Sequence, residues 1–476
     1  MSRLKITIAA AVSAAAVIGA AAAIIPAATA QTSPLSPAAR LLAAGVLPPP
    51  GELLHAALPA AAPAAASLTV PLPPSQCQAR YGTRCYDTAL LRRIYGVDAL
   101  PAGTDGHGAA VALILPFRNP VLLHDLEVFT AQAGLPAPDL HVITIGDPAV
   151  ADPRVPEQAA AQEEGELDSE TLLAMAPRVR IDYVETQQDP AASPASFSAA
   201  TDVVAQLARM QPQVDAVSFS YGWFEQNYAE LAGSPAAGAA MIRAQTAAID
   251  AAVQHGMTVI SADGDTGSTA PDLAGTGVYP DPTVAALAAD PLVTAVSGTL
   301  VTADDTGTRT APDVVWSGNG ASPATGGGVS AVFGRPAWQD PYAAVTGEHR
   351  GVGDISMDAS DQSPVWIYTS RYQLIPGQGL GWTRIAGTSV AAPLFTGIVA
   401  LASQMAGHPL GNINPRLYTM ALDPSASGIQ PVTTGCNTDF GVPGYCAGDG
   451  AYSPPDGTGT IATAALFVPA LAAGGH

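Results

Sequence analysis

The sequence predicts an α/β fold with a parallel sheet flanked by helices on both faces. Short apolar runs of the buried-strand type alternate with helical segments from Tyr86 onward. Such alternation implies parallel strands that are covered on both sides. A further run, from Val390 to Met405, is apolar on every side, as in a helix buried all round. With 476 residues, of which 48% are hydrophobic and 12% charged, the chain can bury a large core.

The predicted strands are Ala110–Leu115, His141–Ile145, Arg180–Glu185, Val214–Ser220, Thr258–Ala262 and Leu292–Ser297. The predicted helices are Pro120–Ala133, Glu164–Ala176, Phe197–Met210 and Pro235–His255. Ligands of such sheets bind at the carboxyl ends of the strands, which is where we expect the site.

The N-terminal 75 residues differ in composition from the rest of the chain. Residues 1–30 are typical of a signal peptide, with Arg3 and Lys5 before an apolar stretch and an Ala-Thr-Ala cleavage site at 28–30. An uncleaved membrane anchor is the alternative, which the cleavage site disfavours. Residues 31–75 are rich in alanine and proline and predict a linker or short pro-segment. A single domain is expected at 76–476.

The charge balance limits the classes of partner. There are 40 acidic against 19 basic residues, which gives a net charge of −21. This argues against nucleic acid and anionic membranes as partners. It suits a secreted, extracellular protein that stays soluble where many carboxylates are protonated.

The four cysteines form two local pairs, Cys77/Cys85 and Cys436/Cys446. Three connectivities are possible. Because an exported protein meets oxidising conditions and short loops close at the least entropic cost, we expect both local disulfides. Neither pair has zinc-ligand spacing with histidines nearby, so cysteine is not expected to bind metal.

A candidate nucleophile, Ser389, follows Gly387 and Thr388 at the start of the apolar run. A hydroxyl at a helix N-terminus lies in a positive field beside free N–H donors that can hold an oxyanion. An ordinary N-cap serine is the alternative for a bare Gly-Thr-Ser. The longer pattern Gly-Thr-Ser-x-x-x-Pro, with its apolar tail, resembles the nucleophile segment of subtilisin-like peptidases.

A histidine base is not in evidence. The first predicted strand ends in Pro116 and Phe117, and none of the eight histidines lies in a His-Gly-x-His motif. His107 precedes that strand, and His255 closes a predicted helix. A Ser-His-Asp mechanism is therefore excluded.

Carboxylates offer an alternative base. Glu164 and Asp168 are four residues apart, so on a helix they share one face. Two such carboxylates share a proton, and one can act as base while the other orients it. Asp265 follows a predicted strand in a glycine-rich turn and, if protonated, can donate to an oxyanion. The alternatives are an acidic helix N-terminus and an Asx turn.

The ordered set Glu-x-x-x-Asp, Gly-Asp-x-Gly and Gly-Thr-Ser-x-x-x-Pro resembles the sedolisins, serine-carboxyl peptidases with a subtilisin-like fold. The similarity covers about Cys77 to the C-terminus. It includes Val-Ser-Phe-Ser-Tyr-Gly at 217–222, Thr-Gly-Gly-Gly-Val-Ser at 325–330 and Pro-Ala-Trp-Gln at 336–339. The resemblance implies that Ser389 is the nucleophile, Glu164 the base, Asp168 its orienting partner and Asp265 the oxyanion-hole acid.

The same resemblance implies substrate-binding and metal-binding segments. Gly326, Gly327 and Gly328 match a segment that pairs with substrate backbone, and Tyr221 stands where the family commonly has a substrate-facing tryptophan. Pro431 and Ser453 replace the two calcium-binding aspartates of the family. We therefore expect no cofactor and no metal site, unless a nearby carboxylate (Asp439, Asp449 or Asp456) rebuilds it. Residues 31–75 are also too few for the family's folded prodomain.

The expected function is peptide-bond hydrolysis at acidic pH by a secreted monomer acting on peptides or proteins as an endopeptidase or exopeptidase. One alternative is a catalytically silent secreted binding protein on the same scaffold. Another is a different serine hydrolase, such as an esterase, although no Gly-x-Ser-x-Gly sequence surrounds Ser389.

Overall fold

The computed structural model describes residues 70–187, 193–209, 213–318, 323–372, 380–448 and 452–474. The chain divides into two units, Met1–Leu35 and Ser36–His476, and every described residue lies in the second. The predicted signal peptide and most of the Ala/Pro-rich segment therefore lie outside the described residues. The described structure begins before residue 76, the predicted start of the domain, since helix α2 starts at Pro74.

The strands are β1 (Ala110–Pro116), β2 (Asp139–Ile145), β3 (Arg180–Thr186), β4 (Ala216–Phe219), β5 (Thr258–Ala262), β6 (Val293–Leu300), β7 (Val314–Val315), β8 (Gly328–Gly334), β9 (His349–Val352), β10 (Ile355–Asp358), β11 (Val365–Thr369), β12 (Gly381–Ile385), β13 (Ile429–Gln430) and β14 (Thr460–Ile461). The helices are α2 (Pro74–Tyr81), α3 (Thr88–Ile94), η1 (Val97–Ala99), α4 (Leu122–Ala133), α5 (Pro156–Met175), α6 (Pro194–Leu207), α7 (Glu225–Leu231), α8 (Pro235–Gln254), η3 (Ala337–Tyr342), α9 (Ala343–Thr346), α10 (Thr388–Ala406), α11 (Asn414–Met420), α12 (Pro424–Ser427) and α13 (Ala464–Ala472).

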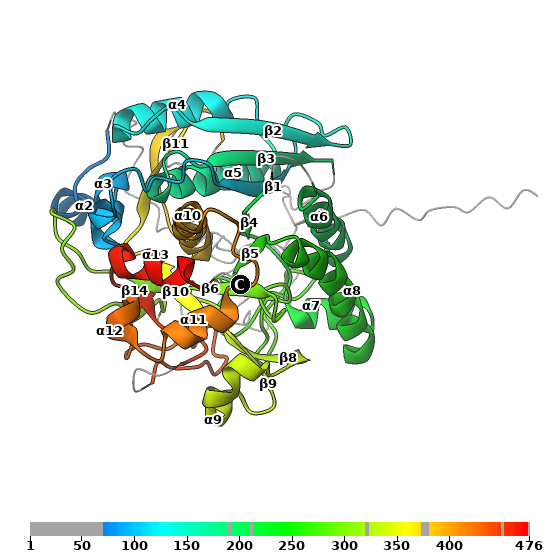
Figure 1. Ribbon diagram of the computed structural model, residues 1–476. Coiled ribbons are helices and arrows are strands. Elements are labelled where there is room, and N and C mark those ends of the chain that lie inside the picture. Colours follow the sequence, from blue (N-terminus) through cyan, green and yellow to red (C-terminus); the bar gives the residue numbers. More distant parts are fainter. Residues whose placement is uncertain are drawn as a thin grey trace, which may run out of the picture. The chain divides into compact units, whose positions relative to one another are not determined.

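The main sheet confirms the predicted fold class. Its strand order is β13-β14-β10-β6-β5-β4-β1-β3-β2, with β7 attached to β6. All pairs from β2 to β14 are parallel, whereas β13 and β7 pair antiparallel. Helices α6 and α8 lie on one side of this sheet, and α10 and α13 on the other (Figure 1). Parallel strands need this double cover because both of their faces are apolar.

Each of the six predicted strands is present, but one differs in burial. The prediction that His141–Ile145 is a buried strand is wrong, because β2 forms the edge of the sheet and all of its residues are partly or fully exposed. Val142, for example, keeps 54% of its surface exposed. A short apolar run does not by itself distinguish a central strand from an edge strand. The helix predicted from Glu164 is also longer, since α5 begins at Pro156.

Helix α10 is the central helix of the fold. It packs on β4, β5, β6 and β10 as well as on α5 and α13. Its length and hydropathy match those of a membrane span, yet 83% of that window is buried inside the protein. The apolar run is therefore the core helix that its all-round hydrophobicity predicts.

Helices α5 and α10 run in the same direction. Midway along α10, Gly397 lies against Leu172 and Met175 of α5. At the C-terminal end of α10, Gln404 accepts hydrogen bonds from the N–H groups of Asp105 and Gly106, and the same turn contacts Ala176 after α5. Because both C-terminal ends meet one turn, the N-terminal halves of the two helices also lie at one end.

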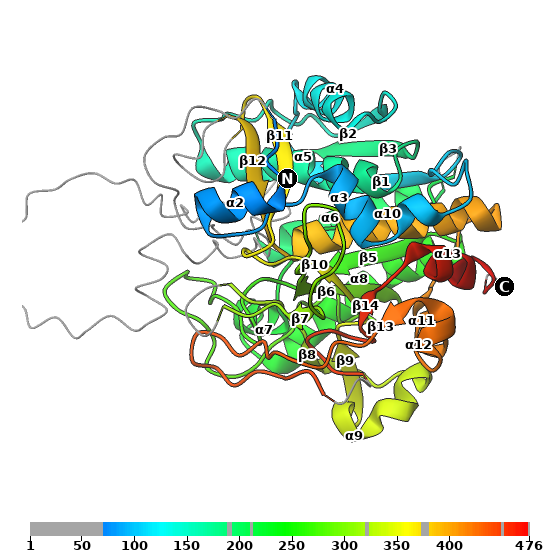
Figure 2. The same ribbon diagram turned by 90° about the vertical axis from the view of Figure 1, so that its left-hand side faces the viewer.

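Both predicted disulfides, Cys77–Cys85 and Cys436–Cys446, are present. The first anchors α2 beside the antiparallel hairpin of β11 and β12 (Figure 2), where Cys77 packs with Trp366 and Trp382. This hairpin leads directly into the Gly-Thr-Ser segment, so its position sets where α10 begins.

Candidate active site

Ser389 is buried in the first turn of α10. The chain enters the helix through Gly387, whose φ of 137° lies in a region that favours glycine. The N–H of Gly387 donates a 2.8 Å hydrogen bond to the carbonyl of Ala359, which follows β10. The hydroxyl of Ser389 is thereby held at the carboxyl end of the central strands, beside the N-terminal N–H groups of α10.

Asp265 is hydrogen-bonded to Thr388, the residue before Ser389. Its Oδ1 accepts hydrogen bonds from the N–H and the hydroxyl of Thr388, both at 2.8 Å. The N–H of Gly264 donates to the same hydroxyl at 3.2 Å. The turn that follows β5 is therefore fastened to the first turn of α10, and the carboxyl of Asp265 lies next to the candidate nucleophile.

Glu164 and Asp168 form one buried carboxyl pair on α5, and Ser220 joins it from the end of β4. The Ser220 hydroxyl donates to Oδ1 of Asp168 at 2.6 Å. Burial raises the pKa of Glu164 well above its usual value, the charge of Asp265 raises it further, and hydrogen bonds with Ser220 and Asp168 lower it. Burial and the charge of Glu164 likewise raise the pKa of Asp168. Glu164 thus interacts with carboxyls on two sides, and these groups titrate as a coupled set.

The structure brings the four predicted catalytic residues to one end of the sheet. Thr388 connects Ser389 to Asp265, the charge of Asp265 acts on Glu164, and Glu164 bonds Asp168. The parallel course of α5 and α10 places the N-terminal halves of both helices at this end. The arrangement can support attack by a hydroxyl, proton transfer to a carboxylate and stabilisation of an oxyanion.

Sequence reasoning missed two members of this site, Asp263 and Ser220. Oδ2 of Asp263 accepts from the Ser297 hydroxyl at 2.5 Å, and Oδ1 accepts from the Thr325 hydroxyl at 3.2 Å. Burial and the neighbouring charge of Asp265 raise the pKa of Asp263 well above its usual value. Both residues lie inside the motifs at 217–222 and 261–268, so the signal was their position directly after a strand.

Comparison with known proteins bears on this geometry. No protein-family model matches the sequence. Kumamolisin from Bacillus sp. (strain MN-32) is 33% identical over 330 residues, which are 67% of this chain and 53% of that protein. Sedolisin from Pseudomonas sp. (strain 101) is 28% identical over 357 residues, which are 72% of this chain and 54% of that protein. A solved structure of Pseudomonas sedolisin, a serine-carboxyl proteinase complexed with two molecules of pseudo-iodotyrostatin, matches 83% of this chain and 100% of its own, with a TM-score of 0.67 and 25% identity.

The chain belongs to the sedolisin family. Its fold is accordingly subtilisin-like. The chain spans about half the length of the curated relatives it matches, 53% and 54% of the two named here.

The predicted substrate-binding residues of this sedolisin-family chain are largely enclosed by protein. Tyr221 is buried, and its hydroxyl donates to the carbonyl of Ile114 on β1. Gly326, Gly327 and Gly328 are buried as well. The N–H of Gly326 donates to the carbonyl of Gly264, while the side-chain amide of Asn437 donates to the carbonyls of Gly326 and Gly327. These glycines therefore support the Asp263–Asp265 turn, and their pairing with substrate stays a prediction.

The calcium site implied by the family is not matched by the donor set. Ser453 donates its hydroxyl to Asp456 within a single turn. Burial raises the pKa of Asp456 to about 8 and that of Asp439 to about 7, so both carboxyls are neutral in acid. Within the described ranges there is no group of three or more histidine, cysteine or acidic side chains placed to hold a metal, and Asp449 lies outside those ranges. Calcium affinity depends on how many of its oxygen ligands are charged, and Pro431 and Ser453 supply no carboxylate, so the loss of the site stays a prediction.

Proposed function

We propose that this sedolisin-family chain is a secreted serine-carboxyl peptidase that hydrolyses peptide bonds at acidic pH through an acyl-enzyme on Ser389. One observation carries the proposal: Thr388 fastens Asp265 beside Ser389, while the charge of Asp265 acts on the buried Glu164–Asp168 pair. The two disulfides are typical of a protein from an oxidising compartment and support secretion. The net charge of −21 supports peptides rather than nucleic acid or membranes as partners, and we propose a monomer.

In the first half-reaction, the Ser389 hydroxyl oxygen attacks the carbonyl carbon of the scissile bond, and its proton passes to the carboxylate of Glu164. Asp168 orients Glu164 for this transfer. The negative oxygen that develops accepts a hydrogen bond from the protonated carboxyl of Asp265. The C–N bond then breaks, and the leaving amine takes the proton from Glu164.

The second half-reaction releases the acyl group. Water attacks the ester carbonyl, Glu164 accepts a proton from that water, and the Ser389 oxygen leaves with a proton from Glu164. The carboxylic acid product and the free serine result, so no further reactant is needed.

The test compares single substitutions in the purified full chain. Ser389→Ala removes the nucleophile and Glu164→Gln removes the base, so each should lower kcat by about 10⁴-fold or more. Ser403→Ala is the matched control, because Ser403 is buried on the same helix at its far end. A fluorophosphonate probe should label the wild type and the control but not Ser389→Ala. Near-normal turnover by either site variant would remove that residue from the mechanism, and absence of both labelling and turnover in the wild type would indicate a silent scaffold.

A further inference from the structure

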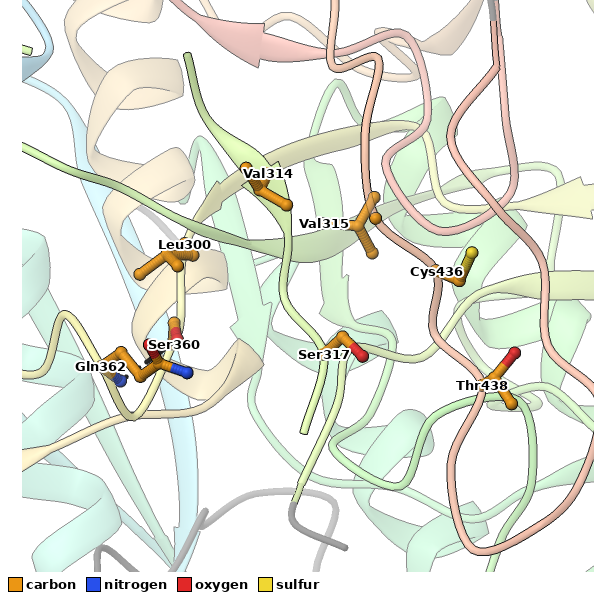
Figure 3. A pocket seen from close by; sticks show the side chains of 9 residues that line it. Leu300, Val314, Val315, Ser317, Ser360, Gln362, Cys436 and Thr438 are labelled. Carbon is orange, nitrogen blue, oxygen red and sulfur yellow. Dashed lines mark hydrogen bonds between the residues drawn. The ribbon is translucent and has the colours of Figure 1, made fainter. Parts of the chain in front are cut away.

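A pocket of about 660 Å³ is lined by residues of β6 and β7 and of the segments that follow β10 and β13 (Figure 3). Its floor is the segment of β7, with Val314 and Val315 on the strand and Ser317 after it. Figure 3 shows this segment running between two walls, one that carries Ser360 and one that carries Cys436. The volume is sufficient for a side chain together with the backbone beside it.

The pocket is continuous with the segments that position the candidate catalytic residues. On one wall, Ser360 directly follows Ala359, whose carbonyl accepts the N–H of Gly387 at 2.8 Å. From the floor, the Trp316 carbonyl accepts the N–H of Thr325 at 3.1 Å. The Thr325 hydroxyl in turn bonds Asp263. The pocket therefore adjoins the segments that hold Ser389 and Asp263 in place.

The pocket and the proposed base, Glu164, lie on opposite sides of strand β5. The pocket residues belong to β6 and β7 or to the segments that follow β7, β10 and β13, and all of these strands lie on one side of β5. Helix α5, which carries Glu164, packs on β1 on the other side of β5. The pocket and Glu164 thus flank Ser389 along the line of strand ends.

The lining of the pocket carries no charge among its described residues. Leu300 and the two valines are apolar, and Ser360, Ser317, Gln362 and Thr438 are neutral at every pH of interest. The candidate active site is rich in carboxyls, whereas the nearest carboxyl of this wall, Asp361, is not a lining residue and accepts a hydrogen bond from the Ser360 hydroxyl at 3.4 Å. Such a surface favours an uncharged side chain over a charged one, which would lose hydration without gaining a partner.

The second wall is held by a covalent bond. Cys436 is joined to Cys446, and Gly435 before it packs so closely that an added Cβ would come within 2.9 Å of the Val315 Cβ. The N–H of Val315 also donates to the Thr434 carbonyl at 3.0 Å. The distance between the wall and the floor is therefore fixed, which a selective pocket requires.

We propose that this pocket is a subsite for an uncharged side chain of the bound peptide, on the side of Ser389 away from Glu164. Gln362 at its rim and Val314 on its floor determine which side chain is accepted. The proposal rests on the proposed peptidase function and adds the substrate class. The Gln362 side chain is exposed, and Val314 lines the floor, so both can be changed with little effect on the core.

The experiment uses two variants of the full chain, Gln362→Lys and Val314→Phe, with Gln254→Lys as the matched control. Gln254 is exposed near the C-terminal end of α8, before the amino end of β5 and far from the strand ends that form the site. Each protein digests a peptide library at acidic pH, and mass spectrometry records the residues at every position around the cleaved bond. The same library is also bound to each variant in the Ser389→Ala background, which needs no turnover.

At one position of the peptide near the cleaved bond, the wild type should prefer uncharged residues. Gln362→Lys should lower acceptance of lysine and arginine there by about twofold to fivefold, as expected for an exposed charge pair. Val314→Phe should shift the same position from large to small side chains by about tenfold. The control should keep the wild-type profile.

The outcomes separate this proposal from the proposed function. Cleavage with unchanged profiles in both variants overturns the subsite and leaves the peptidase in place. Altered binding profiles without cleavage by the wild type support the subsite and overturn the peptidase. Neither binding nor cleavage of peptides overturns both.

Discussion

Gly397 of α10 lies directly against Met175 of α5, where an added Cβ would come within 2.6 Å of the Met175 Cβ. The Leu172 carbonyl oxygen would lie 3.0 Å from the same added atom. Only a glycine lets the two helices approach this closely. Since α5 carries Glu164 and α10 carries Ser389, the contact fixes how the proposed base and nucleophile are spaced.

Replacement of Gly397 by valine should therefore damage activity from a distance. The added bulk forces α5 and α10 apart and should cost about 1–3 kcal/mol of stability. A displacement of the base by about 1 Å should lower kcat by about 10²-fold. Ala240→Val, which places the same side chain on the exposed face of α8, should change neither quantity. Full activity of a destabilised Gly397→Val would show that the helix spacing does not control the site.

Ser220 should control the acid limb of the pH–rate profile. Its hydroxyl lowers the pKa of both Glu164 and Asp168, whereas burial raises them. The proposed base must be ionised and Asp265 protonated, so kcat/KM should be bell-shaped with a maximum at about pH 3–5. Ser220→Ala removes a group that favours ionisation, so the acid limb should move to higher pH.

The control for this measurement is Ser218→Ala on the same strand. Ser218 is buried, and its hydroxyl has no hydrogen-bond partner within the described part of the chain. Its profile should match the wild type. An unchanged acid limb in Ser220→Ala would separate Ser220 from the titrating pair, and a wild-type maximum at or above neutrality would sink the carboxylate-base mechanism.

Stability should be greatest in acid because of the buried carboxyl of Glu170, which supports the β11–β12 hairpin. Glu170 accepts the N–H of Tyr368 at 2.8 Å, and Asp125 from α4 accepts the N–H of Ser370 at 2.8 Å. Burial raises the pKa of Glu170 well above its ordinary value of 4.5, and the charges of Glu166 and Asp125 add to this. A raised folded-state pKa gives stability that is complete below the unfolded value and is lost as the pH rises toward the folded value.

Calorimetry between about pH 4 and pH 8 tests this relationship. Each buried carboxyl that titrates in this window should cost about 1.4 kcal/mol per pH unit. Glu170→Gln keeps an acceptor for Tyr368 without the charge, so its Tm should fall less with rising pH than that of the wild type. Glu157→Gln, exposed in the first turn of the same helix, should follow the wild type. Parallel curves for Glu170→Gln and the wild type would exclude Glu170 as a source of the pH dependence.

Metal removal and disulfide removal should have different effects. Pro431 and Ser453 supply no carboxylate, so EDTA should leave both Tm and activity unchanged. The double variant Cys436→Ser/Cys446→Ser should lose about 2–4 kcal/mol, because the disulfide closes a short loop. An EDTA-induced fall in Tm that calcium restores would show that other oxygens have rebuilt the site.

The N-terminal boundary can be tested with two truncations. A chain that starts near Ser75 should fold and be active without acid processing, because residues 31–75 offer no core of their own. The Leu72 carbonyl, however, accepts the indole N–H of Trp366 at 3.2 Å, and Leu72 packs against the small hydrophobic cluster that contains Trp366 and Trp382. A chain that starts at Val70 should therefore have a higher Tm than one that starts at Ser75, by about 1–3 kcal/mol in stability. If the chain that starts at Val70 is insoluble while the full chain is active, residues 31–69 have a folding role.

The sequence by itself determined the features that depend on local pattern. Strand β5 lies at Thr258–Ala262 as predicted, because an apolar run bounded by turn residues has few alternatives. His255 lies at the C-terminus of α8, as the helical pattern of this segment predicts. Both disulfides join cysteines that are close along the chain. The ordered motifs were also sufficient to indicate the family, because each is a short continuous segment.

Only the tertiary structure decided the relationships between distant segments. Nothing in the pattern of residues 139–145 showed that β2 is an edge strand, since that depends on which strands pair with it. The contact of Gly397 with Met175, the bonds from Thr388 to Asp265 and the support of the β11–β12 hairpin by Asp125 all join segments more than 100 residues apart in the chain. Local periodicity reports which face of an element is apolar, but the partner of that face is selected by the packing of the whole core.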